Sequence, residues 1–232
     1  MASLLAGIRA VVFDLDGTLL DRHRSFELFV RDQWVRFASV LHPVGQDEYV
    51  RAVIERDREG YGPRGALFSD TVAQFGLPAA LAGTLRDDFR AGFASACVLF
   101  PDAIHTLTVL RASGFKLGLI TNGSVRMQSR KLECLALPAM FDAVLISDAE
   151  GVSKPDPEIF RRALERLGVD AADACYVGNH PDIDVAGARA AGMKAVWRRD
   201  AFLPPPTEAN AVIEAIGDLI SERDVSGPER DR

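Results

Sequence analysis

The chain of 232 residues is long enough for one large domain, or for a domain that carries an insertion. Hydrophobic residues make up 48% of the chain and charged residues 26%, a balance that is typical of a globular protein with a sizeable core. The net charge of −6 and the lack of a long Lys/Arg run argue against a nucleic-acid polymer as partner, although a small anionic substrate could meet a local group of cations.

The N-terminal stretch MASLLAGIRAVVF lacks a basic segment and runs directly into the first expected strand. We therefore predict neither a signal peptide nor a segment that crosses a membrane. Cys97, Cys134 and Cys175 are an odd number of cysteines at unrelated spacings, so we interpret them as reduced, mostly buried thiols. Together these features favour a cytoplasmic enzyme.

The first expected strand ends in two acids. Residues 10–13 form an uncharged run of β-forming residues, and Asp14, Asp16, Gly17 and Thr18 follow directly. Because strand side chains alternate between faces, the two carboxylates can point in the same direction. Ligands of open parallel sheets bind at the carboxyl ends of the strands, so we expect the active site here.

Residues 21–95 show helical periodicity and no convincing strand. Helices are expected over residues 25–41, 47–58, 66–75 and 79–94. Because this block begins directly after the acid pair, we interpret it as an inserted cap domain that closes over a bound substrate. At its start, Arg22, His23 and Arg24 either meet an anionic part of the substrate or form a solvated hinge.

Beyond Pro101, expected helices and strands alternate. The strands are expected at residues 116–120, 143–146, 174–177 and 194–197, with an edge strand at 211–213 and a short helix that ends near residue 222. Asp156 is expected to cap one helix, and Asp182 or Asp184 another. This alternation predicts an α/β protein with a doubly wound parallel sheet. The domains are then a core of residues 1–20 and 96–222, a helical cap of residues 21–95, and a flexible tail of residues 223–232.

Polar residues follow each expected strand of the core. Thr121, Asn122 and Gly123 follow the second strand, Lys154 comes after the third, and the segment GNHPDID follows the fourth. These strand ends meet in one crevice of a doubly wound sheet. A carboxylate nucleophile, a second carboxyl group, phosphate-binding donors and oxygen ligands for Mg²⁺ are the components of phosphoryl transfer.

Four motifs in order, FDLDGTLLD, LITNG, the lysine of SKPDPEIF, and VGNHPDIDVAGARAAGM, resemble those of the haloacid dehalogenase (HAD) superfamily. The resemblance covers residues 9–198 and implies a Rossmann-like core whose helical insertion is a C1-type cap. It further implies that Asp14 is the nucleophile and a metal ligand. Asp16 would be the general acid and base, and its backbone carbonyl would also touch the metal.

The same resemblance implies a phosphate-binding role for the Thr121 hydroxyl and for the backbone N–H groups of Asn122 and Gly123. Lys154 would be the cation that bridges nucleophile and phosphate. Asp184 would be the second acid of the fourth motif, close to the metal.

One position departs from the family pattern, because Asn179 stands where the family usually has an aspartate that binds the metal. An amide oxygen can coordinate Mg²⁺ but brings no charge. We therefore expect weaker metal binding, with Asp184 in direct coordination or Asp182 in support. On sequence grounds Asn179→Asp should raise Mg²⁺ affinity or activity.

The function predicted on this basis is a Mg²⁺-dependent phosphatase that hydrolyses a small phosphorylated metabolite through an aspartyl phosphate. A phosphosugar mutase of the same fold also keeps Asp16 and stays an alternative, whereas dehalogenases and phosphonate hydrolases lack an acid there. The second alternative is a catalytically weakened relative that binds a phosphorylated ligand or a protein partner, as Asn179 suggests. Neither the substrate nor the oligomeric state is indicated.

Overall fold

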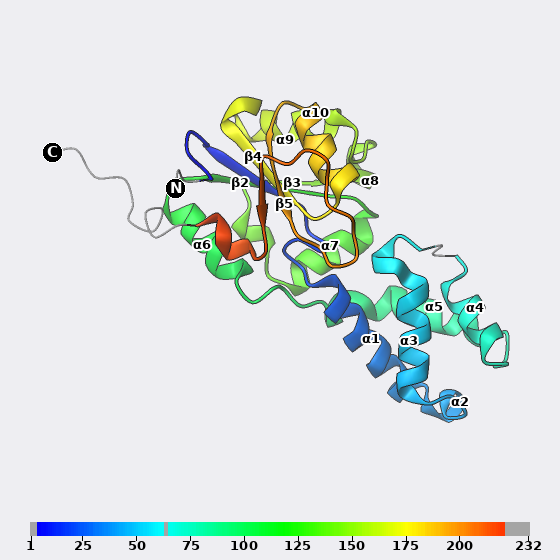
Figure 1. Ribbon diagram of the computed structural model, residues 1–232. Coiled ribbons are helices and arrows are strands. Elements are labelled where there is room, and N and C mark those ends of the chain that lie inside the picture. Colours follow the sequence, from blue (N-terminus) through cyan, green and yellow to red (C-terminus); the bar gives the residue numbers. More distant parts are fainter. Residues whose placement is uncertain (1–3, 63–64, 221–232) are drawn as a thin grey trace. The chain divides into compact units, whose positions relative to one another are not determined.

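The computed structural model describes residues 4–62 and 65–220. The chain folds into two compact units (Figure 1). The first unit contains the chain up to Leu20 and from Leu99 onward, and the second contains Asp21–Val98. The predicted tail of residues 223–232 lies outside the described residues.

A six-stranded parallel sheet forms the centre of the first unit, in the order β3-β2-β1-β4-β5-β6. The strands are β1 (Ala10–Phe13), β2 (Lys116–Thr121), β3 (Ala143–Ile146), β4 (Ala174–Gly178), β5 (Lys194–Arg198) and β6 (Ala211–Ile213). β1 lies in the middle, with Val12 paired to Gly118 on one side and to Tyr176 on the other. The sheet grows outward from β1 in both directions, which confirms the predicted doubly wound α/β fold.

Helices cover both faces of this sheet, with α9 and α10 on one face and α6 and α7 on the other (Figure 1). The helices of the first unit are α6 (Ala103–Ala112), α7 (Val125–Cys134), α8 (Ser147–Glu150), α9 (Pro157–Leu167) and α10 (Gly187–Ala190), with short 3₁₀ turns at Pro138–Met140, Ala171–Asp173 and Ile216–Leu219. α9 begins as predicted, because the Asp156 carboxylate accepts a hydrogen bond from the Glu158 N–H and Pro157 occupies the first turn. Its apolar face packs on Val12, Tyr176 and neighbouring strand residues.

The predicted N-cap residue of the helix that follows β4 is wrong. His180, rather than Asp182 or Asp184, occupies the cap position, and its Nδ1 accepts from the N–H groups of Asp182 and Ile183 at 3.2 Å each. The element itself is a π-helical stretch, Pro181–Ala186, that continues into α10. The physical reason is that the carboxylate of Asp184 turns into the protein interior, where it binds a buried lysine instead.

Across residues 21–62 and 65–98, the second unit contains five helices. They are α1 (Arg22–Arg36), α2 (Ala38–Leu41), α3 (Gln46–Asp57), α4 (Leu67–Gln74) and α5 (Leu81–Gly92), with 3₁₀ turns at Arg58–Gly60 and Phe93–Ala96. The expected single helix over residues 25–41 is broken at Phe37, where φ and ψ of −104° and 21° end α1. Two of the residues at the start of the block are paired within it: Arg22 with Asp57 at 2.5 Å and His23 with Glu59 at 2.7 Å.

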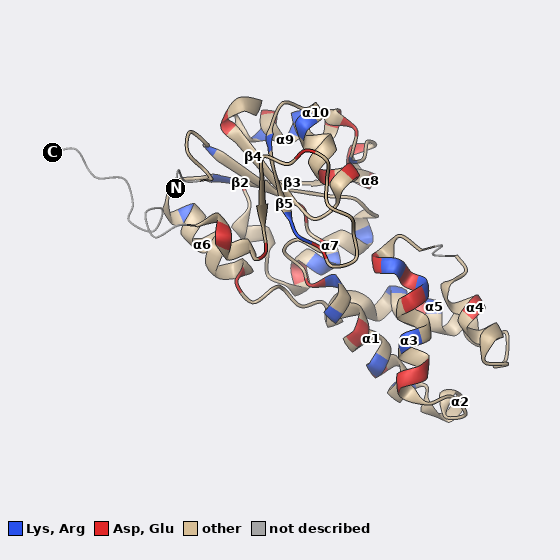
Figure 2. Cartoon of the chain, in the orientation of Figure 1, with Lys and Arg blue, Asp and Glu red and all other residues tan. Residues whose placement is uncertain are grey.

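The three cysteines are free thiols, of which Cys97 and Cys175 are buried as expected and Cys134 is exposed. Among the helices that the structure describes, none combines the length and the apolar composition needed to cross a bilayer. Figure 2 shows Lys and Arg interspersed with Asp and Glu within each unit.

A buried glutamine ties three helices of the second unit together. Gln33 of α1 donates through Nε2 to the backbone carbonyl of Leu85 at 3.0 Å and to Asp88 at 2.8 Å. Its Oε1 accepts from the Tyr49 hydroxyl at 2.9 Å. Gln33 and Tyr49 are 0% exposed, so their side-chain polar atoms depend on this network for hydrogen bonds.

We predict that Gln33→Leu destabilises the protein, because the buried Tyr49 hydroxyl loses the acceptor of its hydrogen bond. An unsatisfied buried polar group costs about 1–3 kcal/mol. Urea unfolding followed by circular dichroism measures the loss. Gln74→Leu, at an exposed position of α4, is the matched control and should shift stability by at most about 0.5 kcal/mol. Equal losses in both variants would contradict the network.

Candidate functional site

A buried lysine lies between two carboxylates at the carboxyl end of the sheet. The Nζ atom of Lys154 lies 2.6 Å from Asp14 Oδ1 and 2.6 Å from Asp184 Oδ1, and 2.8 Å from the Tyr176 hydroxyl. Lys154 is 4% exposed, Asp14 6% and Asp184 1%. The three charged groups that sequence analysis placed in one site are therefore in direct contact, together with Tyr176, which sequence analysis did not identify.

Hydrogen bonds to the backbone of Asp14 and of Lys154 fix where these two residues lie. The Asp14 N–H continues the sheet by donating to Val177 of β4 at 2.9 Å. Lys154, in the loop before α9, is held by the side chain of Asn122: its N–H donates to Asn122 Oδ1 at 3.0 Å, and its carbonyl accepts from Nδ2 at 2.9 Å. The Asn122 side chain thus anchors the lysine loop, in addition to the role that its backbone N–H was expected to have.

The second acid, Asp16, is bound by α7. Lys131 Nζ lies 2.6 and 2.8 Å from the two oxygens of Asp16, and Gln128 Nε2 donates to Oδ2 at 2.9 Å. Gln128 also donates to the Thr121 hydroxyl, which links the acid to the expected phosphate-binding residue. The contacts of Gln128 and Lys131 with the acid were not predicted from the sequence. Their spacing of three residues, which places both on one face of a helix, was the available signal.

The expected phosphate-binding turn follows β2. Thr121 ends that strand and is 1% exposed. Gly123 has φ of +144°, which side-chain-bearing residues rarely adopt, and a Cβ atom there would lie 3.1 Å from Gln128. The Gly123 N–H donates to Ser147 Oγ at 3.0 Å, so this donor has to leave Ser147 before it can bind a phosphate oxygen.

Burial and charge shift the pKa values of the central pair. Burial raises the pKa of Asp14 from 3.8 to about 7; Lys154 opposes this shift, whereas the neighbouring Asp184 and Asp16 add to it. Burial lowers the pKa of Lys154, but Asp14 and Asp184 together outweigh burial and hold that pKa above its ordinary value. The ammonium group is therefore charged at neutral pH, while Asp14 is poised between its two forms.

Asn179 follows β4 and is 4% exposed. Its Nδ2 donates to the Asp200 carboxylate at 2.7 Å, and the Thr18 hydroxyl lies 3.4 Å from its Oδ1. Its carbonyl accepts from the Trp197 indole at 2.7 Å. Sequence analysis flagged Asn179 but did not identify Asp200, which lies beyond the fourth motif.

No three His, Cys, Asp or Glu side chains converge on a possible metal position within residues 4–62 and 65–220. The oxygens of Asp184 accept hydrogen bonds from Lys154, Tyr176 and the His180 N–H, so a metal bound by Asp184 would share an oxygen with one of these donors. Asp182 is exposed.

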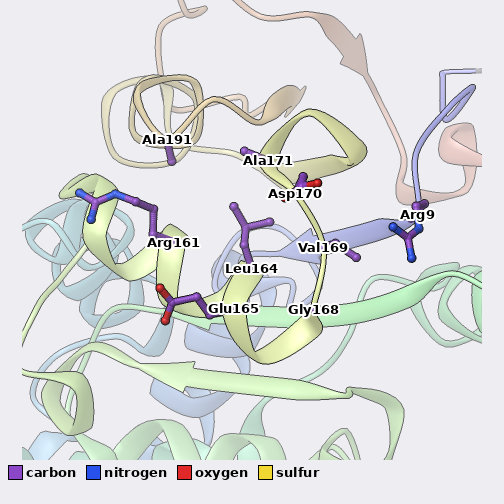
Figure 3. A pocket seen from close by; sticks show the side chains of 9 residues that line it. All are labelled: Arg9, Arg161, Leu164, Glu165, Gly168, Val169, Asp170, Ala171 and Ala191. Carbon is purple, nitrogen blue, oxygen red and sulfur yellow. The ribbon is translucent and has the colours of Figure 1, made fainter.

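A separate groove of about 490 Å³ lies at the opposite edge of the sheet (Figure 3). Its lining includes Arg9, directly before β1, and Ala171, just before β4. The amino ends of these strands border this groove, whereas Asp14 follows the carboxyl end of β1. The groove therefore does not contain the expected catalytic residues.

Comparison with known proteins identifies relatives along most of the chain. The model of the haloacid dehalogenase-like hydrolase family matches residues 8–192. A glyceraldehyde 3-phosphate phosphatase of Pyrococcus abyssi is 32% identical over 202 residues, which cover 82% of this chain and 81% of that protein. A phosphoserine phosphatase of Thermus thermophilus is 42% identical over 121 residues, only 52% of this chain and 48% of that protein.

Solved structures agree with this assignment. The crystal structure of a HAD phosphatase from Thermococcus onnurineus has a TM-score of 0.64 and 30% sequence identity to this chain, with 97% of this chain and 100% of that chain covered. Because the family match includes the central strands and the acid pair that follows β1, and spans more than half of the chain, the protein belongs to the haloacid dehalogenase-like hydrolases.

Proposed function

We propose that this protein is a Mg²⁺-dependent phosphatase that hydrolyses a small phosphorylated metabolite through an aspartyl phosphate on Asp14. The observation that carries the proposal is the buried contact of Asp14 with Lys154 at 2.6 Å, beside a second acid, Asp16, that Lys131 holds in place. Relatives that are phosphatases support the choice of a phosphate ester as substrate.

In the first proposed step an Asp14 oxygen attacks phosphorus, and the bond between phosphorus and the leaving oxygen breaks. Asp16 gives its proton to the leaving oxygen. In the second step Asp16 takes a proton from water, the water oxygen attacks phosphorus, and the bond to Asp14 breaks. Lys154, the Thr121 hydroxyl and the backbone N–H groups of the following turn hold the other phosphate oxygens.

The available donors suit Mg²⁺, which prefers oxygen ligands. They are the Asp14 carboxylate, the backbone carbonyl of Asp16 and the amide oxygen of Asn179, with Asp184 beside them. Burial raises the pKa of Asp14 to about 7, and the neighbouring Asp184 and Asp16 add to that shift, so a further positive charge beside Asp14 would favour the ionised form that attacks phosphorus. When bound, Mg²⁺ supplies the positive charge that lets a carboxylate approach a phosphate.

The substrate class we propose is a phosphomonoester of a small metabolite. The names of the relatives include glyceraldehyde 3-phosphate, phosphoserine and phosphoglycolate phosphatases and a pyrimidine 5'-nucleotidase, all of which describe small phosphate esters. The mixture of acidic and basic residues in each unit also fits a small ligand better than a polyanion (Figure 2). Free thiols are consistent with a cytoplasmic location.

Asp14→Asn is predicted to abolish phosphate release, because the amide is a poor nucleophile and cannot form the acyl phosphate. A panel of p-nitrophenyl phosphate, glyceraldehyde 3-phosphate, phosphoserine, phosphoglycolate and UMP, assayed for free phosphate with and without Mg²⁺, measures the effect. No bisphosphate primer is added, so release by the wild type separates a phosphatase from a mutase. Full activity in Asp14→Asn would contradict the nucleophile, and no turnover by the wild type would favour the ligand-binding alternative.

Lys154→Met is predicted to lose activity and to destabilise the metal-free protein. Removing one partner of a buried ion pair costs about 3–5 kcal/mol. The loss grows with pH, because Asp14 already has a pKa near 7 against 3.8, and without the ammonium group its ionised form is still less favourable in the folded state.

Thermal unfolding between pH 5 and pH 8 measures this loss of stability. At pH 5 Asp14 is protonated in the folded protein and the destabilisation is smallest; at pH 8 it is largest. Lys194→Met, at the start of β5, is the matched control, because the Lys194 Nζ donates to a backbone carbonyl, that of Ala6 at 3.2 Å, rather than to a buried carboxylate. A loss for Lys154→Met that does not change with pH would contradict the buried pair.

Lys131→Met is predicted to lower kcat more than it raises KM, because Lys131 holds the acid that acts on the leaving oxygen and does not itself hold phosphate. The rate should fall by about 10²–10⁴, the usual contribution of a positioned acid or base. Steady-state kinetics on p-nitrophenyl phosphate, whose leaving group needs little protonation, and on an alkyl phosphate separate the two effects. The alkyl phosphate should suffer more; an equal loss on both esters would contradict this role.

A further inference from the structure

The side-chain amide of Asn179, which replaces the expected acid of the fourth motif, has a fixed orientation. The Asp200 carboxylate has only acceptor atoms, so the Asn179 atom that lies 2.7 Å from it is the amide nitrogen. The amide oxygen of Asn179 therefore points the other way, toward the Thr18 hydroxyl at 3.4 Å. Asp200 thus decides which end of the amide faces Thr18.

The surroundings leave the Asn179 amide little room to rotate. Gly17 has φ of +85°, and a Cβ atom there would overlap the Asn179 amide group. The backbone at Asn179 is held by the Trp197 indole, which donates to its carbonyl at 2.7 Å. Asp200 is held as well, because its Oδ1 accepts from the Phe202 N–H at 2.8 Å.

We propose that Asp200 is a positioning residue of the metal site, and that the pair Asn179–Asp200 does the work of one carboxylate. Asn179 supplies an oxygen on the Thr18 side of its amide. Asp200 orients that amide and places a negative charge directly behind it, which polarises the oxygen toward a cation. This inference rests on the proposed Mg²⁺-dependent function and deepens it.

The pair changes the expectation for Asn179→Asp. A carboxylate at position 179 would face the Asp200 carboxylate across the present 2.7 Å contact, where the amide donor is lost and two like charges oppose each other. The single substitution is therefore expected to weaken the site rather than to restore it. Asn179→Asp combined with Asp200→Asn reverses donor and acceptor and keeps the hydrogen bond.

The first measurement is metal affinity, without substrate. Mg²⁺ binding by calorimetry and Mn²⁺ binding by electron paramagnetic resonance are compared for the wild type, Asp200→Ala and Asp200→Asn. Asp200→Ala removes orientation and charge and should weaken binding about 10–100-fold, the usual effect of losing a residue that orients a ligand. Asp200→Asn can still accept from Asn179 and should fall between the two.

Glu214→Gln is the matched control, because Glu214 is an exposed acid near the same end of the chain that pairs with Arg199 at 2.5 Å. It removes one negative charge without touching Asn179 and should bind both metals as the wild type does. Asp200→Ala with wild-type affinity would overturn the inference. So would a loss in Glu214→Gln as large as that in Asp200→Ala, because net charge would then explain the effect.

The second measurement needs no metal. Unfolding of the metal-free protein should show that Asn179→Asp is destabilised and that the double variant recovers most of the loss. In the metal assay, the double variant should bind at least as tightly as the wild type. Additive effects of the two substitutions in unfolding would overturn the pairing.

The two measurements distinguish this inference from the proposed function. A wild type that binds neither Mg²⁺ nor Mn²⁺ would overturn the metal-dependent function and the positioning role, while the metal-free cycle still decides the pairing. A wild type that binds metal and an Asp200→Ala variant that binds it equally well would overturn only the inference.

Discussion

The ammonium group of Lys154 is the contact on which the rest of the core depends. A buried charge is tolerated only when it is paired and hydrogen bonded, and Lys154 satisfies that requirement with Asp14, Asp184 and the Tyr176 hydroxyl. These partners come from the end of β1, from β4 and from the π-helical stretch after it. One side chain therefore joins its own loop to the end of β1 and to the β4 region, which are distant in sequence, and it explains why Asp184 does not cap its own helix.

The sequence predicted the strands well, and it placed Asp14, Lys154 and Asp184 together, for local reasons. Each strand is a short apolar run followed by polar residues, and Asp14, Thr121 and Lys154 come directly at such boundaries or in a recognisable motif. The residues that sequence analysis missed act across long separations. Lys131 meets Asp16 115 positions away, and Asp200 meets Asn179 across a loop. The spacing of Gln128 and Lys131 indicates a shared helix face, but no local pattern indicates which acid that face contacts.

The second unit also depends on a residue that the sequence pattern did not predict. Its helices follow from apolar periodicity, yet what joins α1, α3 and α5 is a polar residue, Gln33, that a pattern of apolar positions passes over. Around it, the rings of Phe26, Phe29 and Phe93 pack edge to face, at centroid distances of 5.8 and 5.9 Å. The insertion therefore has an aromatic and polar core of its own, which is what a cap needs if it is to move as one body.

Charge balance connects the acid cluster to the proposed chemistry. Asp14, Asp16 and Asp184 bring three carboxylates, and Lys131 and Lys154 bring two ammonium groups, so the ionised cluster carries one excess negative charge. A phosphate ester adds about two more. Asp14 must lose its proton to attack phosphorus, although burial holds its pKa near 7. In the proposed mechanism a divalent cation beside Asp14 would meet both demands, and an Asn179 amide backed by Asp200 would hold that cation without adding a fourth carboxylate.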